Sequence, residues 1–363
     1  MVNFCSSIGV PAAILSLDQE KAFDRVDWGF LHSTLVTMGY GPSFIQWVML
    51  FYSAVQSAVN VHGHISSFFS LSHGVRQGCP LLALLYVLVA EELACSIRAN
   101  PHIAGLSLPG FSSPLPCISQ YADDTSLIVV SDRAIDEVFD VYDLYERGSE
   151  AKLNLSKCEG LCLGSWNGRT DAPVTISSTS MKIKVLGVFI GPGNLDEVNW
   201  RPRITVVETV LNPWRQRSLS FCGRALVINA LALSRVWYVA SLIPVPPWVI
   251  LELNSLVFKF FWNGKRDLVQ RQVVHQPNFL GGFPVVNCQA KIWALRVQWV
   301  RRFVISLASW FSFLVHWFSV AFAVPSQMVF SFPFFFVPDS LPPFYHELVF
   351  AWRSCNGSFT SGF

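Results

Sequence analysis

The sequence has few charged residues and few cysteines. Only 14% of its 363 residues are charged and 52% are hydrophobic, which excludes a disordered chain, since such chains combine low hydrophobicity with high net charge. Nine cysteines are too few for a disulfide scaffold, and none forms the C-x-x-C pair typical of structural zinc sites. The chain does not open with a basic segment followed by an apolar one, so we expect no secretory signal and a protein that is not secreted.

The small net charge of +2 conceals an uneven distribution. Residues 1–166 carry 8 Lys and Arg against 16 Asp and Glu, whereas residues 167–363 carry 18 against 8. An acidic half joined to a basic half indicates that one part could hold cations while the other binds a polyanion.

Residues 303–338 contain no Asp, Glu, Lys or Arg. The first part of this segment, residues 303–324, is long enough to cross a bilayer as a helix. The alternative is a set of aromatic-rich helices buried against the rest of the chain. We favour the second interpretation, because serines and a histidine recur at three- or four-residue spacing and indicate a two-faced helix. We therefore do not expect a membrane partner.

The pattern of apolar runs and breaks predicts strands and helices in a mixed order. We expect a strand at 11–17, helices beginning at Asp27 and Pro42, a hairpin turning at Gly63, a helix from Pro80 to about Arg98, a second hairpin within 117–130 and a helix capped by Ser131 or Asp132. Further strands follow, and beyond Asn194 the pattern is helical. This order predicts an α+β protein in which helices cover one face of a mixed sheet, followed by a helical second domain.

Two sites place carboxylates where expected strands end. Asp18 directly follows the apolar run 12–17, and Asp123-Asp124 lie at the tip of the second hairpin. An unpaired charge cannot be buried in the core, so these side chains would share one space if their strands are neighbours. Clustered carboxylates repel each other unless hard divalent cations neutralise them. The alternative is that Asp-Asp is an ordinary turn dipeptide and Asp18 an ordinary strand end.

Three motifs, in this order and spacing, resemble the reverse transcriptase of LINE-type (non-LTR) retrotransposons. They are D-Q-E-K-A-F-D-R-V-D-W at 18–28, G-V-R-Q-G-C-P-L at 74–81 and the Y-x-D-D box at 121–124. Two weaker motifs, L-N-L-S-K at 153–157 and V-L-G-V at 185–188, follow them. The resemblance implies the palm of a right-hand polymerase, an antiparallel sheet backed by helices, followed by a helical thumb and a C-terminal helical region. The corresponding ranges are 1–192, 193–270 and 271–363.

The resemblance implies a nucleotidyl-transfer site that uses two Mg²⁺ ions, or Mn²⁺ in their place. Asp18, Asp123 and Asp124 would form it: the first two as metal ligands, with the backbone carbonyl of Gln19 beside them, and Asp124 as the supporting carboxylate. The substrates implied are deoxynucleoside triphosphates, an RNA template and a DNA primer whose 3′-hydroxyl is extended.

Four further residues match nucleotide-binding positions of the family. Phe23 matches the aromatic gate whose ring excludes a 2′-hydroxyl, and Gln77 and Gly78 match the loop that touches nucleotide and template. Lys157 would lie near the leaving pyrophosphate, where positive charge is stabilising. Outside the motif, Phe23 would be interpreted as a core residue and Lys157 as a solvated surface residue.

The basic half matches the place of the family's thumb. Phosphate contacts from Arg and Lys give sequence-independent binding. Our candidates for contact with template or primer backbone are Arg215, Arg217, Lys265 and Arg266, and the later helix at 293–302, with Arg296, would extend that surface. A solvated charged face is the alternative for each of them.

The sequence departs from the family in three ways. About seventeen residues precede Asp18, where the family has a fingers segment, so we expect remnant fingers in an N-terminally truncated chain. Leu82-Ala83 stand where the family has Ser-Pro. No endonuclease domain or Cys/His knuckle is present in the sequence, so the missing parts would come from another chain.

These departures keep a second hypothesis open, a catalytically inactive, nucleic-acid-binding remnant of such an element. An RNA-dependent RNA polymerase is a further alternative, against which Phe23 argues. The family implies a location in nucleus or cytoplasm, and no signal in the sequence decides between them.

Overall fold

The computed structural model describes residues 1–75, 78–169, 181–305, 311–322, 328–330 and 337–359. The chain divides into two compact units. Unit 1 comprises residues 1–107, 111–186 and 190–192, and unit 2 comprises residues 108–110, 187–189 and 193–363. Each unit is described separately below. The assignment of palm, thumb and C-terminal region to particular ranges stays a prediction.

Unit 1 is built on a four-stranded antiparallel sheet with the order β6-β7-β1-β8. Its strands are β1 (Ala12–Leu17), β6 (Ile118–Tyr121), β7 (Asp124–Val129) and β8 (Glu159–Leu163). Side chains alternate between the two faces of a strand, so one face of β1 and β7 carries Ala13, Leu15, Leu17, Leu127 and Val129, all buried. The other face carries Ser16 and Ser126 and is partly open.

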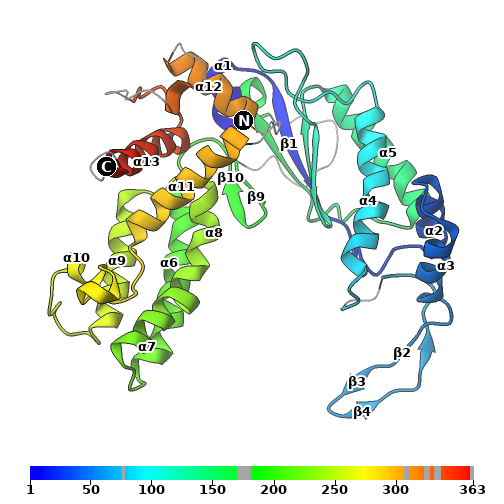
Figure 1. The fold of residues 1–363 in the computed structure, drawn as a ribbon. Coiled ribbons are helices and arrows are strands. Elements are labelled where there is room, and N and C mark those ends of the chain that lie inside the picture. The colour runs from blue at the N-terminus through cyan, green and yellow to red at the C-terminus, as the bar shows by residue number, and fades with distance from the viewer. Residues whose placement is uncertain (76–77, 170–180, 306–310, 323–327, 331–336, 360–363) are drawn as a thin grey trace. The chain divides into compact units, whose positions relative to one another are not determined.

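Helices cover the apolar face of this sheet. They are α4 (Leu82–Ala99) and α5 (Asp132–Ser149), which contact β6 and β7, with α2 (Trp28–Thr37) packed on these two helices and α3 (Pro42–Leu50) packed on α2. All four lie on the same side of β1 in Figure 1. The core cluster joins sheet residues to the inner faces of α4 and α5. The Ser131 hydroxyl caps α5 by accepting a hydrogen bond from the Ala134 amide at 3.1 Å, as predicted. The short helix α1 (Val2–Ile8) precedes the sheet.

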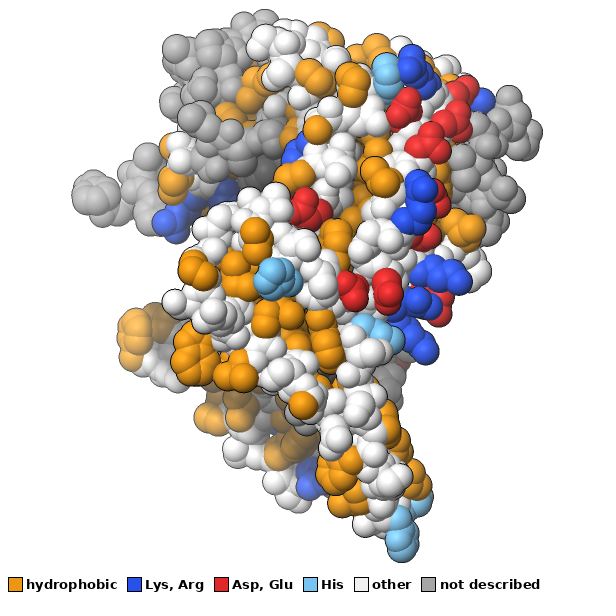
Figure 2. Space-filling model, turned by 90° about the vertical axis from the view of Figure 1, so that its right-hand side faces the viewer, with side chains coloured by type: hydrophobic (Ala, Val, Ile, Leu, Met, Phe, Trp, Pro, Cys, Tyr) orange, Lys and Arg blue, Asp and Glu red, His pale blue; other side chains and the backbone are white. Residues whose placement is uncertain are grey.

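A two-stranded arm projects from unit 1 between α3 and α4 (Figure 1). It is formed by β2 (Gln56–Ser57) paired with β5 (Phe69–Ser70) and by β3 (Asn60–Val61) paired with β4 (His64–Ile65). The predicted turn at Gly63 is confirmed, with φ of 88°. The arm and α3 expose large apolar side chains, among them Trp47, Phe51, Val61, Ile65 and Phe68. Figure 2, which looks onto the right-hand side of Figure 1, shows hydrophobic side chains gathered over the lower part of the surface in view.

Unit 2 is mainly helical. Its helices are α6 (Asp196–Arg215), α7 (Phe221–Leu226), η2 (Val227–Leu233), α8 (Ser234–Leu242), α9 (Pro247–Phe261), α10 (Arg271–Val274), η3 (Asn278–Leu280), α11 (Cys288–Ile305), α12 (Ser312–Phe322), η5 (Met328–Phe330) and α13 (Pro343–Phe359). The segment η2 is a π-helical stretch that continues α7 into α8. Unit 1 also contains η1 (Gly164–Trp166), and a two-stranded sheet of β9 (Ile183–Val185) and β10 (Val188–Ile190) lies where the chain passes between the two units. The predicted α+β class is confirmed.

Part of the charge-free segment 303–324 lies outside the described residues. Its described helix, α12, has 11 residues, and Phe318 on it is buried among aromatic rings. Within the described ranges, Phe221–Leu242 has the length and apolar composition of a membrane span, with 44% of its most apolar window buried. A core helix passes the same test, so this is weak evidence for a membrane.

An ion pair lies inside unit 2. The guanidinium of Arg296 is fully buried and donates to the Glu347 carboxylate at 2.8 Å, to the Ala240 carbonyl and to the Ile243 carbonyl. Burial lowers the pKa of Arg296 and raises the pKa of Glu347, although each partner acts on the other in the opposite direction. The prediction that Arg296 extends a nucleic-acid surface is therefore wrong, because this side chain links α11, α13 and the end of α8 inside the core.

We expect Glu347→Leu to lower the free energy of unfolding by about 3–5 kcal/mol, because it leaves the Arg296 guanidinium buried without its counter-charge. Chemical denaturation followed by tryptophan fluorescence measures the loss. The control is Glu197→Leu, which removes one of two carboxylates from the exposed Arg201 and should cost less than about 1 kcal/mol. Equal losses in the two variants would contradict this account.

Candidate active site

The pairing of β1 with β7 brings the predicted carboxylates together. The last recorded pair sets Leu17 opposite Thr125, so the next positions along both strands are Asp18 and Asp124. Residues directly opposite each other in an antiparallel pair carry their side chains on the same face. Asp18 and Asp124 therefore lie on the open face of the sheet, the face away from α4 and α5.

Asp123 is held in the tight turn that joins β6 to β7. The turn consists of Ala122 and Asp123, while Tyr121 pairs with Asp124 at the ends of the two strands. We expected Asp124 at the tip of the hairpin, but it is the first residue of β7. Ala122 has φ of 53°, a left-handed conformation that costs a residue with a Cβ about 1–2 kcal/mol. A two-residue hairpin turn favours a positive φ at its first central residue, so the tight turn accounts for this conformation.

The three carboxylates affect one another electrostatically. The pKa of Asp124 is raised, first by partial burial and then by the negative charges of Asp123 and Asp18. The ammonium of Lys157, 67% exposed, lies 3.7 Å from Oδ2 of Asp18. The structure therefore brings together Asp18, Asp123, Asp124 and Lys157, which come from three separate motifs of the sequence.

These carboxylates are the kind of donor that a hard divalent cation takes. In the described part of the chain, no group of three or more His, Cys, Asp or Glu side chains converges closely enough to hold a metal ion by itself. Mg²⁺ is usually bound by one or two carboxylates together with substrate phosphates and water, not by a protein cage. Two or three neighbouring carboxylates on an open sheet face fit that mode of binding.

The backbone of Asp18 to Glu20, directly after β1, is hydrogen-bonded to residues 152–154 on the edge opposite β7. The Asn154 amide donates to the Asp18 carbonyl at 2.9 Å, and the Glu20 amide donates to the Lys152 carbonyl at 2.8 Å. Carbonyls of successive residues in an extended strand point to opposite sides. Because the Asp18 carbonyl faces the 152–154 segment, the Gln19 carbonyl faces the β7 side, where the Asp123 turn lies.

Phe23 and the loop expected to touch the nucleotide are tied together by their backbones. The Val75 amide donates to the Phe23 carbonyl at 2.8 Å, and the Gly74 amide donates to the Val26 carbonyl at 2.8 Å. The Phe23 ring is half-buried and packs against Tyr86. Gly78 is exposed with φ of 88° and has no atom within 4 Å of the position a Cβ would take. Gln77 lies outside the described residues.

The weaker motif at 185–188 also reaches the open face of the sheet. A cavity of about 240 Å³ on this face is lined by Tyr121, Asp124 and Ser126 together with Val185 and Leu186.

The helix α4 begins at Leu82, two residues later than predicted, and no side chain caps its first turn. The departure from the family at Leu82-Ala83 therefore coincides with the first residues of this helix.

The predicted nucleic-acid-binding residues of unit 2 differ in their surroundings. Arg217, Lys265 and Arg266 are exposed, and the Arg217 guanidinium lies over the Trp214 ring. Arg215 is half-buried, and its Nε and Nη2 atoms have no hydrogen-bond partner among the described residues.

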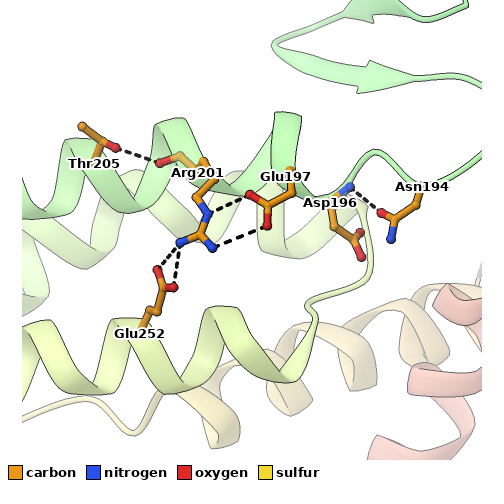
Figure 3. A network of polar contacts seen from close by, with 6 residues as sticks. All are labelled: Asn194, Asp196, Glu197, Arg201, Thr205 and Glu252. Atoms are coloured by element: carbon orange, nitrogen blue, oxygen red, sulfur yellow. Dashed lines mark hydrogen bonds and ion pairs between the residues drawn. The ribbon is translucent and has the colours of Figure 1, made fainter.

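Other arginines of unit 2 hold its helices together. Figure 3 shows Arg201 of α6 between Glu197 on the same helix and Glu252 on α9, at 2.7 and 2.6 Å. Arg203 donates to the Gly187 carbonyl and Arg224 to the Phe261 carbonyl, at 2.8 and 2.9 Å. Part of the basic charge of this half is therefore structural.

Sequence reasoning missed Tyr86 and the role of the Gln19 side chain, although it named the Gln19 backbone carbonyl. Tyr86, on the inner face of α4, donates its hydroxyl to Oε1 of Gln19 at 3.0 Å, and both side chains are buried. Tyr86 occupies an apolar position in an apolar helix, so no pattern in the sequence distinguishes it from ordinary core. Gln19 could be found only as a polar residue that follows Asp18 at a buried strand end.

Comparison with known proteins fits this geometry. A family model described as reverse transcriptase (RNA-dependent DNA polymerase) matches residues 4–190, which contain all the motifs quoted above. The chain belongs to the reverse transcriptase family. This confirms the resemblance and the palm-like sheet that it implied.

The relatives of this reverse transcriptase are proteins of non-LTR retrotransposons. The chain is 32% identical over 309 residues to the uncharacterized 149 kDa protein of transposon TX1 from Xenopus laevis, covering 84% of this chain and 23% of that protein. It is 28% identical over 145 residues to the Pol polyprotein of the element R2DM from Drosophila melanogaster, covering 40% of this chain and 13% of that protein. The chain is thus a reverse transcriptase domain of the non-LTR retrotransposon type.

Solved structures of telomerase resemble this reverse transcriptase domain more distantly. Telomerase from Candida tropicalis, in complex with a fragment of telomeric RNA, aligns with a TM-score of 0.42 and 11% identity over 83% of this chain and 48% of that one. The fold class rests on the sheet and helices described above.

We expect Asp124→Asn to raise the melting temperature of the protein. The pKa of Asp124 is higher in the folded protein than its ordinary value. At a pH above both of these pKa values, the ionised carboxylate therefore destabilises the folded state. The gain at pH 7.5 should stay below about 1 kcal/mol, because the side chain is exposed. The gain should shrink as the pH falls toward 4, where the wild-type carboxyl is increasingly protonated. Thermal melts at both pH values test this, with Asp136→Asn on the exposed face of α5 as the control. A gain that grows at low pH would contradict the sign.

Proposed function

We propose that unit 1 is the catalytic palm of an RNA-directed DNA polymerase, which adds deoxynucleotides to the 3′-hydroxyl of a primer paired with an RNA template. The observation that carries this proposal is the register of β1 and β7, which sets Asp18 beside the Asp123-Asp124 turn on the open face of the sheet. A palm needs carboxylates at this place, where a primer terminus and a triphosphate can approach from solvent.

Asp18 and Asp123 would hold two divalent cations, Mg²⁺ or Mn²⁺, with the Gln19 carbonyl as an additional oxygen ligand and Asp124 as a supporting charge. When bound, such a pair of ions activates the attacking hydroxyl and stabilises the leaving oxygen in an in-line displacement. Partial burial is the main cause of the raised pKa of Asp124, and the charges of Asp123 and Asp18 add to it; a bound cation would relieve that repulsion.

Other residues would position the substrates. The Phe23 ring would lie under the sugar and leave no room for a 2′-hydroxyl, while Gln77 and Gly78 would contact the base pair being formed. Lys157, now paired with Asp18, would move to the leaving pyrophosphate once a cation neutralises that carboxylate. Arg215, Arg217, Lys265 and Arg266 would bind the phosphate backbone of template and primer.

A second candidate function is nucleic-acid binding without catalysis. One observation favours it: α4 begins at Leu82 without a side-chain cap, directly after the loop that would contact the nucleotide. An altered loop would position the triphosphate poorly, and positioning contributes about 7–11 kcal/mol in well-oriented reactions. The two functions predict different outcomes of the same experiment.

We expect Asp123→Asn to reduce primer extension by at least about 100-fold on poly(rA)/oligo(dT) with dTTP and Mg²⁺ or Mn²⁺, because it removes one charged metal ligand. RNA binding, measured by fluorescence anisotropy, should stay within about twofold of wild type. Asp136→Asn serves as the control with the same change of charge far from the turn. A folded, RNA-binding wild-type protein that extends no primer with either metal would support the second function instead.

We expect Phe23→Ala to increase incorporation of UTP relative to dTTP by at least about tenfold, since the ring no longer excludes the 2′-hydroxyl. Steady-state kcat/KM for each nucleotide on the same primer and template measures the ratio. The control is Phe30→Ala, which removes another half-buried ring of unit 1, one that packs against Tyr145. A wild-type protein that already prefers UTP would indicate an RNA polymerase.

A further inference from the structure

Tyr86 lies directly against the predicted gate residue. Its ring centroid is 4.6 Å from that of Phe23, with an angle of 50° between the ring planes, and Tyr86 is 1% exposed. The Phe23 ring is only half-buried, and part of its buried surface lies against Tyr86. Tyr86 itself is fixed by the core between α4 and the sheet.

The other end of Tyr86 reaches the strand that carries Asp18. Its hydroxyl donates to Oε1 of Gln19 at 3.0 Å, and Gln19 is 6% exposed. Burial raises the pKa of Tyr86, and the nearby Tyr145 and Asp123 raise it further, so the hydroxyl stays protonated and remains a donor. One side chain thus contacts both the gate and the residue next to the first carboxylate.

The Gln19 amide depends on this contact. Its Nε2 atom is buried and has no hydrogen-bond partner among the described residues. Without the Tyr86 hydroxyl, both ends of the amide would be buried and unpaired, which costs about 1–3 kcal/mol for each group left unsatisfied. The side chain would then rotate or draw in water, and the backbone at Gln19, which faces the Asp123 turn, would shift with it.

The turn that carries Phe23 needs such a support. Lys21 in this turn has φ of 49°, a left-handed conformation, and the turn is closed by the Asp24 amide donating to the Lys21 carbonyl at 2.8 Å. The Phe23 carbonyl is held by Val75, but this bond fixes the backbone and not the ring. Rejection of a single hydroxyl by a ring depends on repulsion that changes steeply over a few tenths of an ångström, so the height of the ring must be fixed by what lies beneath it.

We infer that Tyr86 is a positioning residue that sets the discrimination between deoxyribonucleotides and ribonucleotides, by supporting the Phe23 ring and by holding Gln19 beside the carboxylates. This inference rests on the proposed role of Phe23 as the gate. Tyr86 does not touch the substrate in this account and acts through its two neighbours.

The test compares two variants of Tyr86 in the full chain. Tyr86→Leu removes the ring that supports Phe23, and Tyr86→Phe keeps the ring and removes only the hydroxyl bonded to Gln19. The measurement is the ratio of kcat/KM for dTTP to kcat/KM for UTP on poly(rA)/oligo(dT). We expect the ratio to fall at least about tenfold in Tyr86→Leu, chiefly because UTP is used better. In Tyr86→Phe, we expect a fall of about two- to fivefold.

The matched control is Tyr145→Phe. Tyr145 belongs to the same core, and its buried hydroxyl donates to the Val89 carbonyl at 3.3 Å, so this variant also loses one buried hydrogen bond. The ring contacts recorded for Tyr145 are with Phe30 and Tyr142. We expect Tyr145→Phe to lower the melting temperature about as much as Tyr86→Phe and to leave the dTTP to UTP ratio unchanged.

A double-mutant cycle with Phe23→Ala separates positioning from general loosening of the core. Once the gate ring is absent, Tyr86→Leu should change the ratio by less than about twofold, because it has no ring left to support. An undiminished effect of Tyr86→Leu in the Phe23→Ala background would overturn the inference. An unchanged ratio in both single Tyr86 variants, with dTTP incorporation intact, would overturn it as well and would leave the proposed function standing.

Failure of the proposed function itself has a different signature. Wild-type protein that is folded and binds RNA but incorporates neither nucleotide would refute polymerisation, and the inference about Tyr86 with it. If Tyr86→Leu does not fold, Tyr86→Phe decides the question alone, since it keeps the volume of the ring and should fold as Tyr145→Phe does.

Discussion

Strand β1 is hydrogen-bonded along both of its edges, to β7 on one side and to β8 on the other, and the candidate active site depends on this double pairing. If this strand shifted by one residue against both neighbours, the side chains that now face the helices would move to the open face of the sheet. The register that buries Leu15 and Leu17 against the helices is therefore the register that sets Asp18 beside Asp124. Stability of the core and geometry of the site have the same origin.

The alternation of side chains divides unit 1 into a packed side and a reactive side. Leu17 and Thr125 point toward the helices, and Asp18 and Asp124, the next residues along, point away from them. Gln19 follows on the packed side, where Tyr86 satisfies its amide oxygen at 3.0 Å. Because Tyr86 also supports Phe23, the packing beneath the sheet extends to the residue proposed to select the sugar. Residues of the core and of the site are thus coupled within one side-chain layer.

The uneven charge of the chain has two different causes in the structure. In unit 1, negative charge includes the three carboxylates that repel each other on the open face, a cost that a bound cation would remove. In unit 2, part of the positive charge is consumed internally, by Arg201 between two glutamates and by Arg296 inside the core. The exposed residues Arg217, Lys265 and Arg266 and the half-buried Arg215 remain for a polyanion. Net charge alone therefore overstates the surface available to nucleic acid.

The sequence by itself determined the family, the α+β class, the strand ending at Asp18 and the hairpin carrying Asp123, because alternation, turn residues and short motifs are local properties of the chain. It also predicted helices beginning at Asp27, which is the N-cap of α2, and at Pro42, and named Ser131 as one of two candidates for the cap of α5. Only the tertiary structure decided that Arg296 is buried, that Asp124 opens β7, and that Tyr86 joins Phe23 to Gln19. The contacts of Arg296 and Tyr86 join residues more than fifty positions apart in the chain, so neither is encoded in the neighbourhood of a single arginine or tyrosine. The start of β7 is set by the geometry of the tight turn at Ala122 and Asp123, which the residue types alone do not fix.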